Sequence, residues 1–258
     1  MRHSERSETA VDALRVVLAE HMSRGAKDAD AQKTTLCMAA VTTALRHEAR
    51  TVVDHHQVNA KLWKSVYDDD VSGAEMALKQ GANADGCLIQ DAMSQTMTPL
   101  HLAAGLPDRQ ISKKLIVLLV KYGANPNTTA ETEMGMTPLT FAVRAGNLHA
   151  MRALLKAGAD PNIADRNGDT ALYYCQGTVT QIKSMMKDLV KAGAHINHQD
   201  MEGMTPLHAW AIRCKKRALI QCLLELGADI TIEDRRNMTP RHWAMHAFNF
   251  EAMLAMAA

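Results

Sequence analysis

The chain of 258 residues has few aromatic side chains, almost no net charge and no long apolar run. Aromatic residues make up 4% of it and hydrophobic residues 47%, with 17 Met, a mixture that favours helices over a β-sandwich or barrel. Lys and Arg number 29 against 28 Asp and Glu, so no global field attracts nucleic acid or an anionic membrane. We expect an all-α protein without a direct nucleic-acid partner.

Cysteine pairs and secretion or membrane signals are also missing. The five cysteines are widely spaced, and none forms the Cys-x-x-Cys pair of zinc or thioredoxin sites. Reduced core thiols are typical of the cytoplasm, or of the nucleus, where we expect this protein. No apolar run approaches the roughly 20 residues that a membrane span needs, and no short apolar segment near the N-terminus indicates secretion. We therefore expect no membrane partner.

One four-residue phrase recurs along the chain. Thr-Pro-Leu-His begins at Thr98 and returns, with substitutions, at steps of 39, 33, 35 and 34 residues. A second phrase, Gly-Ala followed by Asn, Asp or His, keeps the same period. The first phrase begins at Thr98, Thr137, Thr170, Thr205 and Thr239, and the second at Gly81, Gly123, Gly158, Gly193 and Gly227. Two landmarks on one period indicate tandem structural repeats.

A single repeat can be interpreted from its residues. Thr137 is a good N-cap, and Pro138 suits a first helical turn because that turn needs no N–H from it. Gly146 breaks this helix, and a second helix stops at Gly158, the favoured left-handed residue after a helix end. Turn-forming residues follow over 160–168. The unit is predicted to be a helical hairpin with an extended loop, and neither helix is long enough to persist alone.

These motifs resemble the ankyrin repeat, whose signature is T-P-L-H-x-A with a period near 33 residues. The resemblance implies a solenoid in which each unit has a β-turn finger and two antiparallel helices. Its concave face would be formed by the fingers and the first helices. We place an ankyrin-repeat domain at 59–258, with units 60–97, 98–136, 137–169, 170–204 and 205–238 and a closing unit 239–258.

Residues 1–58 lie outside the repeats but have helical apolar stripes. We expect an N-terminal helical cap or extension, since an exposed solenoid end needs a polar cover. An alternative is a regulatory or inhibitory subunit whose N-terminal helices dock on an enzyme. A second alternative is an enzyme with an unrecognised site near His55 and His56.

The sequence contains no recognisable catalytic or cofactor motif. It has no glycine-rich phosphate loop, no G-x-S-x-G and no H-E-x-x-H. The resemblance gives His101, His208 and His242 a structural role, with hydrogen bonds within and between fingers. His55 and His56 are interpreted as a solvated helix end. We therefore predict no enzyme activity, no catalytic residues, no cofactor, no metal and no small-molecule substrate.

Two features depart from the family pattern. Trp210 stands where a small residue is usual, so either the stack opens beside Gly177 or Trp210 exchanges roles with Ala209; we favour the exchange. The extra residues at 84–97 and 105–113 either form part of a binding face or are insertions that surface loops tolerate without a function.

Methionine precedes the motif Thr in four of the five repeats, at Met97, Met136, Met204 and Met238. In the family this position faces the concave groove. Because methionine is flexible and suits adaptable surfaces, we hypothesise that these side chains give the groove an adaptable apolar surface for a protein partner. The alternative is that these side chains pack between fingers. Specificity would come from positions that follow the small-residue segment of the first helices and from the finger tips. The candidate residues on the first helices are Arg144, Ile212 and Arg213. Those at the finger tips are Asp165, Arg166, Glu202, Arg235 and Arg236.

The predicted function follows from this surface. We expect a monomeric, non-catalytic intracellular scaffold or adaptor that binds a protein partner on its concave face. The mixed signs of the candidate residues favour a neutral or mixed partner surface. The basic cluster 213–217 is either a nuclear-import signal or a solvent-exposed turn between two helices.

Overall fold

The structure, a computed structural model, describes residues 55–86, 88–90, 95–132 and 134–257. The chain divides into two compact units, Met1–Gln57 and Val58–Ala258, and the fold below is that of the second. The predicted N-terminal cap and the two alternatives that depend on it lie almost entirely outside the described residues. His55 and His56 are described, and both are exposed.

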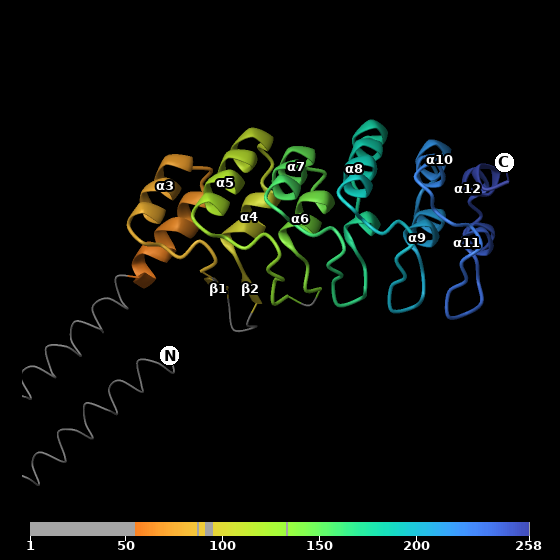
Figure 1. Cartoon of the computed structure of the whole chain (residues 1–258), viewed down its shortest axis with the longest axis horizontal. Helices are drawn as coiled ribbons and strands as arrows, with labels where there is room; N and C mark the ends of the chain where they lie inside the picture. The colour runs from red at the N-terminus through yellow and green to blue at the C-terminus, as the bar shows by residue number, and fades with distance from the viewer. Residues whose placement is uncertain (1–54, 87, 91–94, 133, 258) are drawn as a thin grey trace, which may run out of the picture. The chain divides into compact units, whose positions relative to one another are not determined.

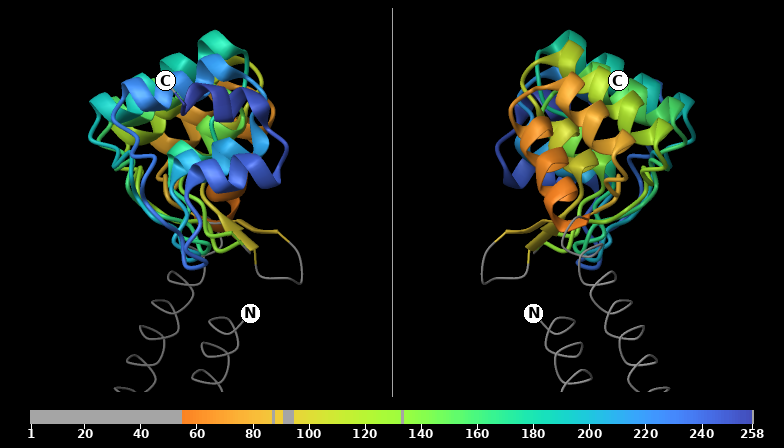
Figure 2. Two further views of the ribbon diagram at one scale, coloured as in Figure 1. Left: turned by 90° about the vertical axis from the view of Figure 1, so that its right-hand side faces the viewer. Right: turned by 90° about the vertical axis from the view of Figure 1, so that its left-hand side faces the viewer.

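The second unit is a row of helix pairs (Figure 1). In each pair a first helix is followed by a second helix, and the second helices lie side by side along one edge of the row. Seen along the row, the helices of successive pairs overlie one another and the loops extend to one side (Figure 2). After helical residues 55–67 the elements are α3 (Val71–Lys79), α4 (Pro99–Gly105), α5 (Arg109–Lys121), α6 (Pro138–Arg144), α7 (Leu148–Lys156), η1 (Ala171–Tyr173), α8 (Val179–Lys191), α9 (Pro206–Arg213), α10 (Arg217–Glu225), α11 (Pro240–His246) and α12 (Phe250–Ala255). The all-α solenoid predicted from the repeats is confirmed.

Short polar side chains start most of these helices. The carboxylate of Asp108 accepts the N–H groups of Gln110 and Ile111 at the start of α5. Asn147 caps α7 by accepting the N–H of Ala150. Such caps satisfy amide groups that have no partner inside the helix.

The Gly of each Gly-Ala phrase ends a second helix. The five glycines at these positions have φ between +88° and +97°, a left-handed conformation in which a side chain would be strained. The N–H of the following Ala then turns back to a carbonyl of the last helical turn, as Ala159 does to Leu154. The repeated Gly therefore fixes where the chain leaves each helix for the next finger.

Stacking buries the inner faces of these short helices. Leu115, Ile116 and Leu119 of α5 and Met151 and Leu154 of α7 have no exposed surface. These helices contact each other, and α7 also contacts α8. Helices of 7 to 13 residues gain their stability from such neighbours rather than from intrinsic propensity.

Three asparagines connect successive fingers, and we call them the asparagine ladder. Each side-chain oxygen accepts a backbone N–H from the next unit at 2.8–2.9 Å, and each side-chain nitrogen donates to the carbonyl of the helix-ending Gly there at 3.0–3.3 Å. Asn127 pairs with Asp160 and Gly158, Asn162 with His195 and Gly193, and Asn197 with Asp229 and Gly227. The ladder fixes the offset between neighbouring units.

The two sets of extra residues take different forms. In the enlarged finger 84–97, β1 (Leu88–Gln90) and β2 (Gln95–Met97) form an antiparallel hairpin in which Leu88 lies opposite Met97. The extra residues at 105–113 do not form a long loop. They lengthen α5, which begins at Arg109 and has 13 residues, against nine in α7.

The fourth unit has lost most of its first helix. In the third unit, the motif Thr137 lies ten positions before Asn147, which caps the second helix α7. In the fourth unit, Thr170 lies only eight positions before Thr178, which caps α8. The shorter segment leaves only the three-residue η1 where α4 and α6 have seven residues each.

Trp210 uses part of the space next to η1. Its side chain is buried, and its indole N–H donates to the carbonyl of Leu172 at 3.0 Å. Ala209 is only half-buried. The expected exchange between Trp210 and Ala209 is therefore wrong, because the stack opens beside Gly177 and accommodates the large ring in place.

Candidate functional site

The four methionines before the motif Thr do not share one environment. Met136 is 2% exposed and packs under Arg144, whose Nη1 lies 3.7 Å from its sulfur. Met97, Met204 and Met238 are half-buried. The expectation of a surface-borne Met136 is wrong, because Arg144 folds over it, while the other three keep some accessible surface.

The backbone at this row is held by the preceding unit. The Met136 carbonyl lies 3.1 Å from His101 Nε2, and the Met238 carbonyl lies 3.0 Å from His208 Nε2. In the fourth unit Tyr173 takes the histidine's place, and its hydroxyl donates to the Met204 carbonyl at 2.6 Å. The predicted structural role of the motif histidines is confirmed for His101 and His208.

His101 is held in its neutral form. Its Nδ1 accepts the N–H of Thr98 at 3.2 Å, so Nε2 carries the proton that is donated to Met136. Burial lowers the pKa of His101 from 6.5 to about 4, because a buried imidazolium loses its hydration. Burial also lowers the pKa of His208. Neither ring is available as a metal ligand or a base.

The candidate residues on the first helices lie near the C-terminal ends of α6 and α9. Arg144 and Arg213 are exposed, and Ile212 is half-buried. Arg213 is oriented by two backbone acceptors, since Nη2 donates to the Tyr173 carbonyl at 2.7 Å and Nε to the Ala209 carbonyl at 3.2 Å. It therefore spans the gap left by the missing turn of the fourth unit.

The candidate residues of the fingers divide into exposed and buried. Arg166, Glu202, Arg235 and Arg236 are exposed, and the guanidinium of Arg236 lies 5.7 Å from the centre of the Trp243 ring. Neighbouring finger backbones are joined where the Arg235 N–H donates to the Glu202 carbonyl.

Asp165 does not lie at an exposed tip, as we had expected, because its side chain is only 8% exposed. Its carboxylate turns inward to accept the N–H groups of Asn167 and Asp169. The Tyr174 hydroxyl lies 2.7 Å from Asp165 and 2.9 Å from Asp169. Burial raises the pKa of Asp169, helped by the charge of Asp165.

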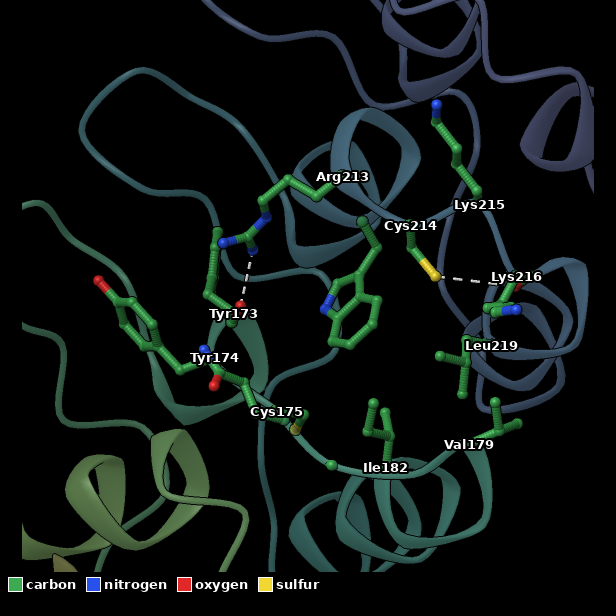
Figure 3. Close-up of a pocket in the computed structure, with 13 residues that line it drawn as sticks. Tyr173, Tyr174, Cys175, Val179, Ile182, Arg213, Cys214, Lys215, Lys216 and Leu219 are labelled. Carbon is green, nitrogen blue, oxygen red and sulfur yellow. Dashed lines mark hydrogen bonds between the residues drawn. The ribbon is translucent and has the colours of Figure 1, made fainter.

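An open cleft of about 470 Å³ lies where the fourth unit is shortened (Figure 3). Its walls combine apolar side chains from units four and five with three basic residues. The lining residues are Tyr173, Tyr174, Cys175, Gln176, Gly177, Val179, Ile182, Trp210, Arg213, Cys214, Lys215, Lys216 and Leu219. The cleft and the candidate surface of the first helices share Arg213.

The sequence model described as Ankyrin repeats (3 copies) matches residues 109–200 and 180–257. The chain belongs to the ankyrin-repeat family. Ankyrin repeats are modules of protein–protein interaction, and the family is typically non-catalytic.

Several curated ankyrin-repeat proteins are similar to this chain. Human Ankyrin repeat domain-containing protein 63 is 28% identical over 131 residues, which are 50% of this chain and 34% of that protein. Inversin of Gallus gallus is 36% identical over 115 residues, 45% of this chain and 10% of that protein. Ankyrin repeat protein nuc-2 of Neurospora crassa is 36% identical over 104 residues, 40% of this chain and 9% of that protein. The matched segments thus cover about a third or less of these relatives.

Three cysteines in the described part of the chain are poor nucleophiles. Cys175, Cys214 and Cys222 are buried and free. Burial raises the pKa of the Cys175 thiol to about 12 and also raises the pKa of the other two, so the reactive thiolate is disfavoured.

In the part of the chain that the structure describes, no group of three His, Cys, Asp or Glu side chains could hold a metal ion. Within the same residues, no helix is long and apolar enough to cross a membrane.

The cleft is the feature of these ankyrin repeats that our sequence analysis missed. A signal was present: Thr170 lies eight positions before Thr178, which caps the second helix, whereas Thr98 and Thr137 each lie ten positions before the corresponding caps, Asp108 and Asn147. A first helix two residues short cannot complete its last turn. Counting that interval in each repeat would have located the opening.

Proposed function

We propose that this ankyrin-repeat protein is a non-catalytic scaffold or adaptor that holds a protein partner on the face formed by its first helices and fingers. The family supports the general role of protein binding. The choice of face rests on how the first helices present their side chains.

The observation that carries the proposal is the combination of accessible apolar surface and held arginines on the first helices and the finger bases. Ile212, Met204 and Met238 are half-buried, so each keeps apolar surface that a partner could cover. Arg144 and Arg213 are exposed, and packing or hydrogen bonds hold both of them. A pre-oriented arginine loses less entropy on binding than a free one, and arginine is enriched at interface hot spots.

The cleft beside Arg213 adds an anchoring point. Trp210, Ile182 and Leu219 form an apolar wall in a cavity of about 470 Å³, which is large enough for a bulky side chain. Interface energy concentrates where a side chain fills a desolvated pocket. We therefore include the cleft in the proposed surface.

The finger residues give the surface both charge signs. Arg166, Arg235 and Arg236 are exposed, and so is Glu202, whose carbonyl accepts the N–H of Arg235. A partner surface that also carries both signs would complement this pattern, and such charges contribute to specificity more than to raw affinity.

Site-specific photo-crosslinking tests the proposal. A benzophenone amino acid would replace Arg144 in one variant and Ile212 in another. A third variant would carry it at Met76, which is 61% exposed on the second helix α3 and serves as the matched control. Each full-length variant would be irradiated in native extract, and adducts would be identified by mass spectrometry.

We expect the same protein to be captured at 144 and 212 and not at 76. Substitution of Arg213 by Glu should then reduce the adduct at 212, because the arginine lies on the same surface. Equal capture at 76, or different proteins at 144 and 212, would contradict binding on this face.

A further inference from the structure

The second helices α5, α7 and α8 have an unusual charge content. Together they carry nine Lys and Arg residues and a single acidic residue, although the whole chain has 29 basic and 28 acidic residues. The basic residues are Arg109, Lys113, Lys114, Lys121, Arg152, Lys156, Lys183, Lys187 and Lys191. We call this surface the basic outer face.

The cations of the basic outer face lie in register. Lys121, Lys156 and Lys191 are the last residues of their helices and are 35 positions apart. Arg152 and Lys187 repeat the same step about one turn earlier. Because α5 packs against α7 and α7 against α8, equivalent positions form rows across the three helices (Figure 1). Interaction with the helix dipole explains one cation at each C-terminus and leaves the others unexplained.

A groove of about 510 Å³ runs among these residues. Its charged lining consists of Lys113, Arg152, Lys156 and Lys191 with one carboxylate, Asp188, which pairs with the Nε of Arg152 at 2.6 Å. Three cations of the lining are thus left without an ion-pair partner among the described residues.

His149 also lines the groove. His149 Nδ1 is buried and has no partner among the described residues. The floor beside it includes the apolar side chains of Ala153 and Leu155. Three cations without an ion-pair partner beside apolar side chains favour an anionic ligand.

We propose that the basic outer face binds an acidic segment of a partner protein in this groove. Other anionic macromolecules fit less well. The three helices contain no Phe, Trp or Tyr to stack on bases, and Val117 is their only strongly exposed large apolar side chain for insertion into lipid. An extended chain with carboxylates every few residues can follow the groove and pair with successive rows of cations.

This site is separate from the face proposed above. The second helices form the outer layer, whereas Arg144 and Ile212 belong to the first helices (Figure 1). The two proposals can therefore fail independently.

Binding of a fluorescein-labelled peptide of about twelve glutamates tests the proposal by fluorescence anisotropy on the full-length protein. The groove variant carries Lys113→Gln, Lys156→Gln and Lys191→Gln. The control variant carries Lys61→Gln, Lys64→Gln and Arg241→Gln, which removes the same net charge from exposed basic residues elsewhere. Circular dichroism would establish that both variants keep the helical content of the parent.

We expect the groove variant to raise Kd about tenfold at about 50 mM salt, with a change below about twofold in the control, because Coulomb energies fall with distance and screening. Equal changes in the two variants, or no binding by the parent protein, would refute the groove. Parallel titrations with a short RNA duplex and with phosphatidylserine vesicles compare the other polyanions, and tighter, groove-dependent binding of either would overturn the assignment to an acidic peptide.

Discussion

Mild acid should destabilise the ankyrin array, and the imidazole of His101 should contribute a measurable part of this effect. In the folded chain His101 has a pKa of about 4, against 6.5 for a free histidine, because it is buried and its Nδ1 already accepts the Thr98 N–H. Below pH 6.5 the unfolded chain binds a proton that the folded chain does not. Stability therefore falls as the pH is lowered from 6.5 towards 4.

The size of the effect follows from the two pKa values. A difference of about 2.5 units corresponds to a total of roughly 3.4 kcal/mol once both states are protonated. Between about pH 7.5 and pH 5, His101 alone should remove about 2 kcal/mol of the free energy of unfolding. That is a large part of the 5–15 kcal/mol that stabilises a typical domain.

The chain supplies a non-titrating replacement, since Thr140 occupies the equivalent position of the next unit and lies 3.1 Å from its own N-cap, Thr137. Urea unfolding followed by circular dichroism would compare the parent with His101→Thr at both pH values. The variant should lose about 2 kcal/mol less than the parent on acidification. His242→Thr, at the exposed equivalent position, controls for the substitution. Equal pH dependence of the parent and His101→Thr would refute the reasoning.

Three further predictions concern packing and the finger carboxylates. Leu154→Ala removes a fully buried side chain from α7 and should cost about 2–5 kcal/mol in urea unfolding. Met136→Gln buries an amide under Arg144 and should cost roughly 1–3 kcal/mol, whereas Met204→Gln at a half-buried position should cost clearly less; equal losses would contradict the difference in burial. Asp169 has a raised pKa, so its stabilising contribution is complete below pH 3.8 and is lost as the pH rises through the folded-state value. We therefore compare the free energy of unfolding of Asp169→Asn with that of the parent at two pH values. The difference should favour the variant more at neutral pH than at about pH 3.5.

The repeat phrases were sufficient to predict the helix pairs because each signal acts locally. Thr137 and Pro138 start a helix, and Gly158 ends one, through backbone preferences that neighbouring units do not override. The role of His101 was predictable for the same reason, since its partners are set by the period.

Side-chain exposure was harder to predict because it depends on contacts between units. Met136 and Met204 occupy equivalent positions, yet Arg144 covers only the first. Trp210 kept its place because the preceding first helix is short, and its size alone could not reveal this. The basic outer face was hidden by the net charge of +1, which averages over surfaces of opposite sign.

The asparagine ladder has a mechanical consequence. Asn127, Asn162 and Asn197 follow one another at equal steps of 35 residues, but the next equivalent position is Thr231, which bonds within its own finger to Asp229. Under tension along the array, the hydrogen bonds of the asparagine ladder resist the separation of neighbouring units. In the described segment beyond Thr231, no asparagine makes such hydrogen bonds between fingers. We therefore expect a stretched molecule to yield first at its C-terminal units, while the part between Asn127 and Asn197 holds its spacing.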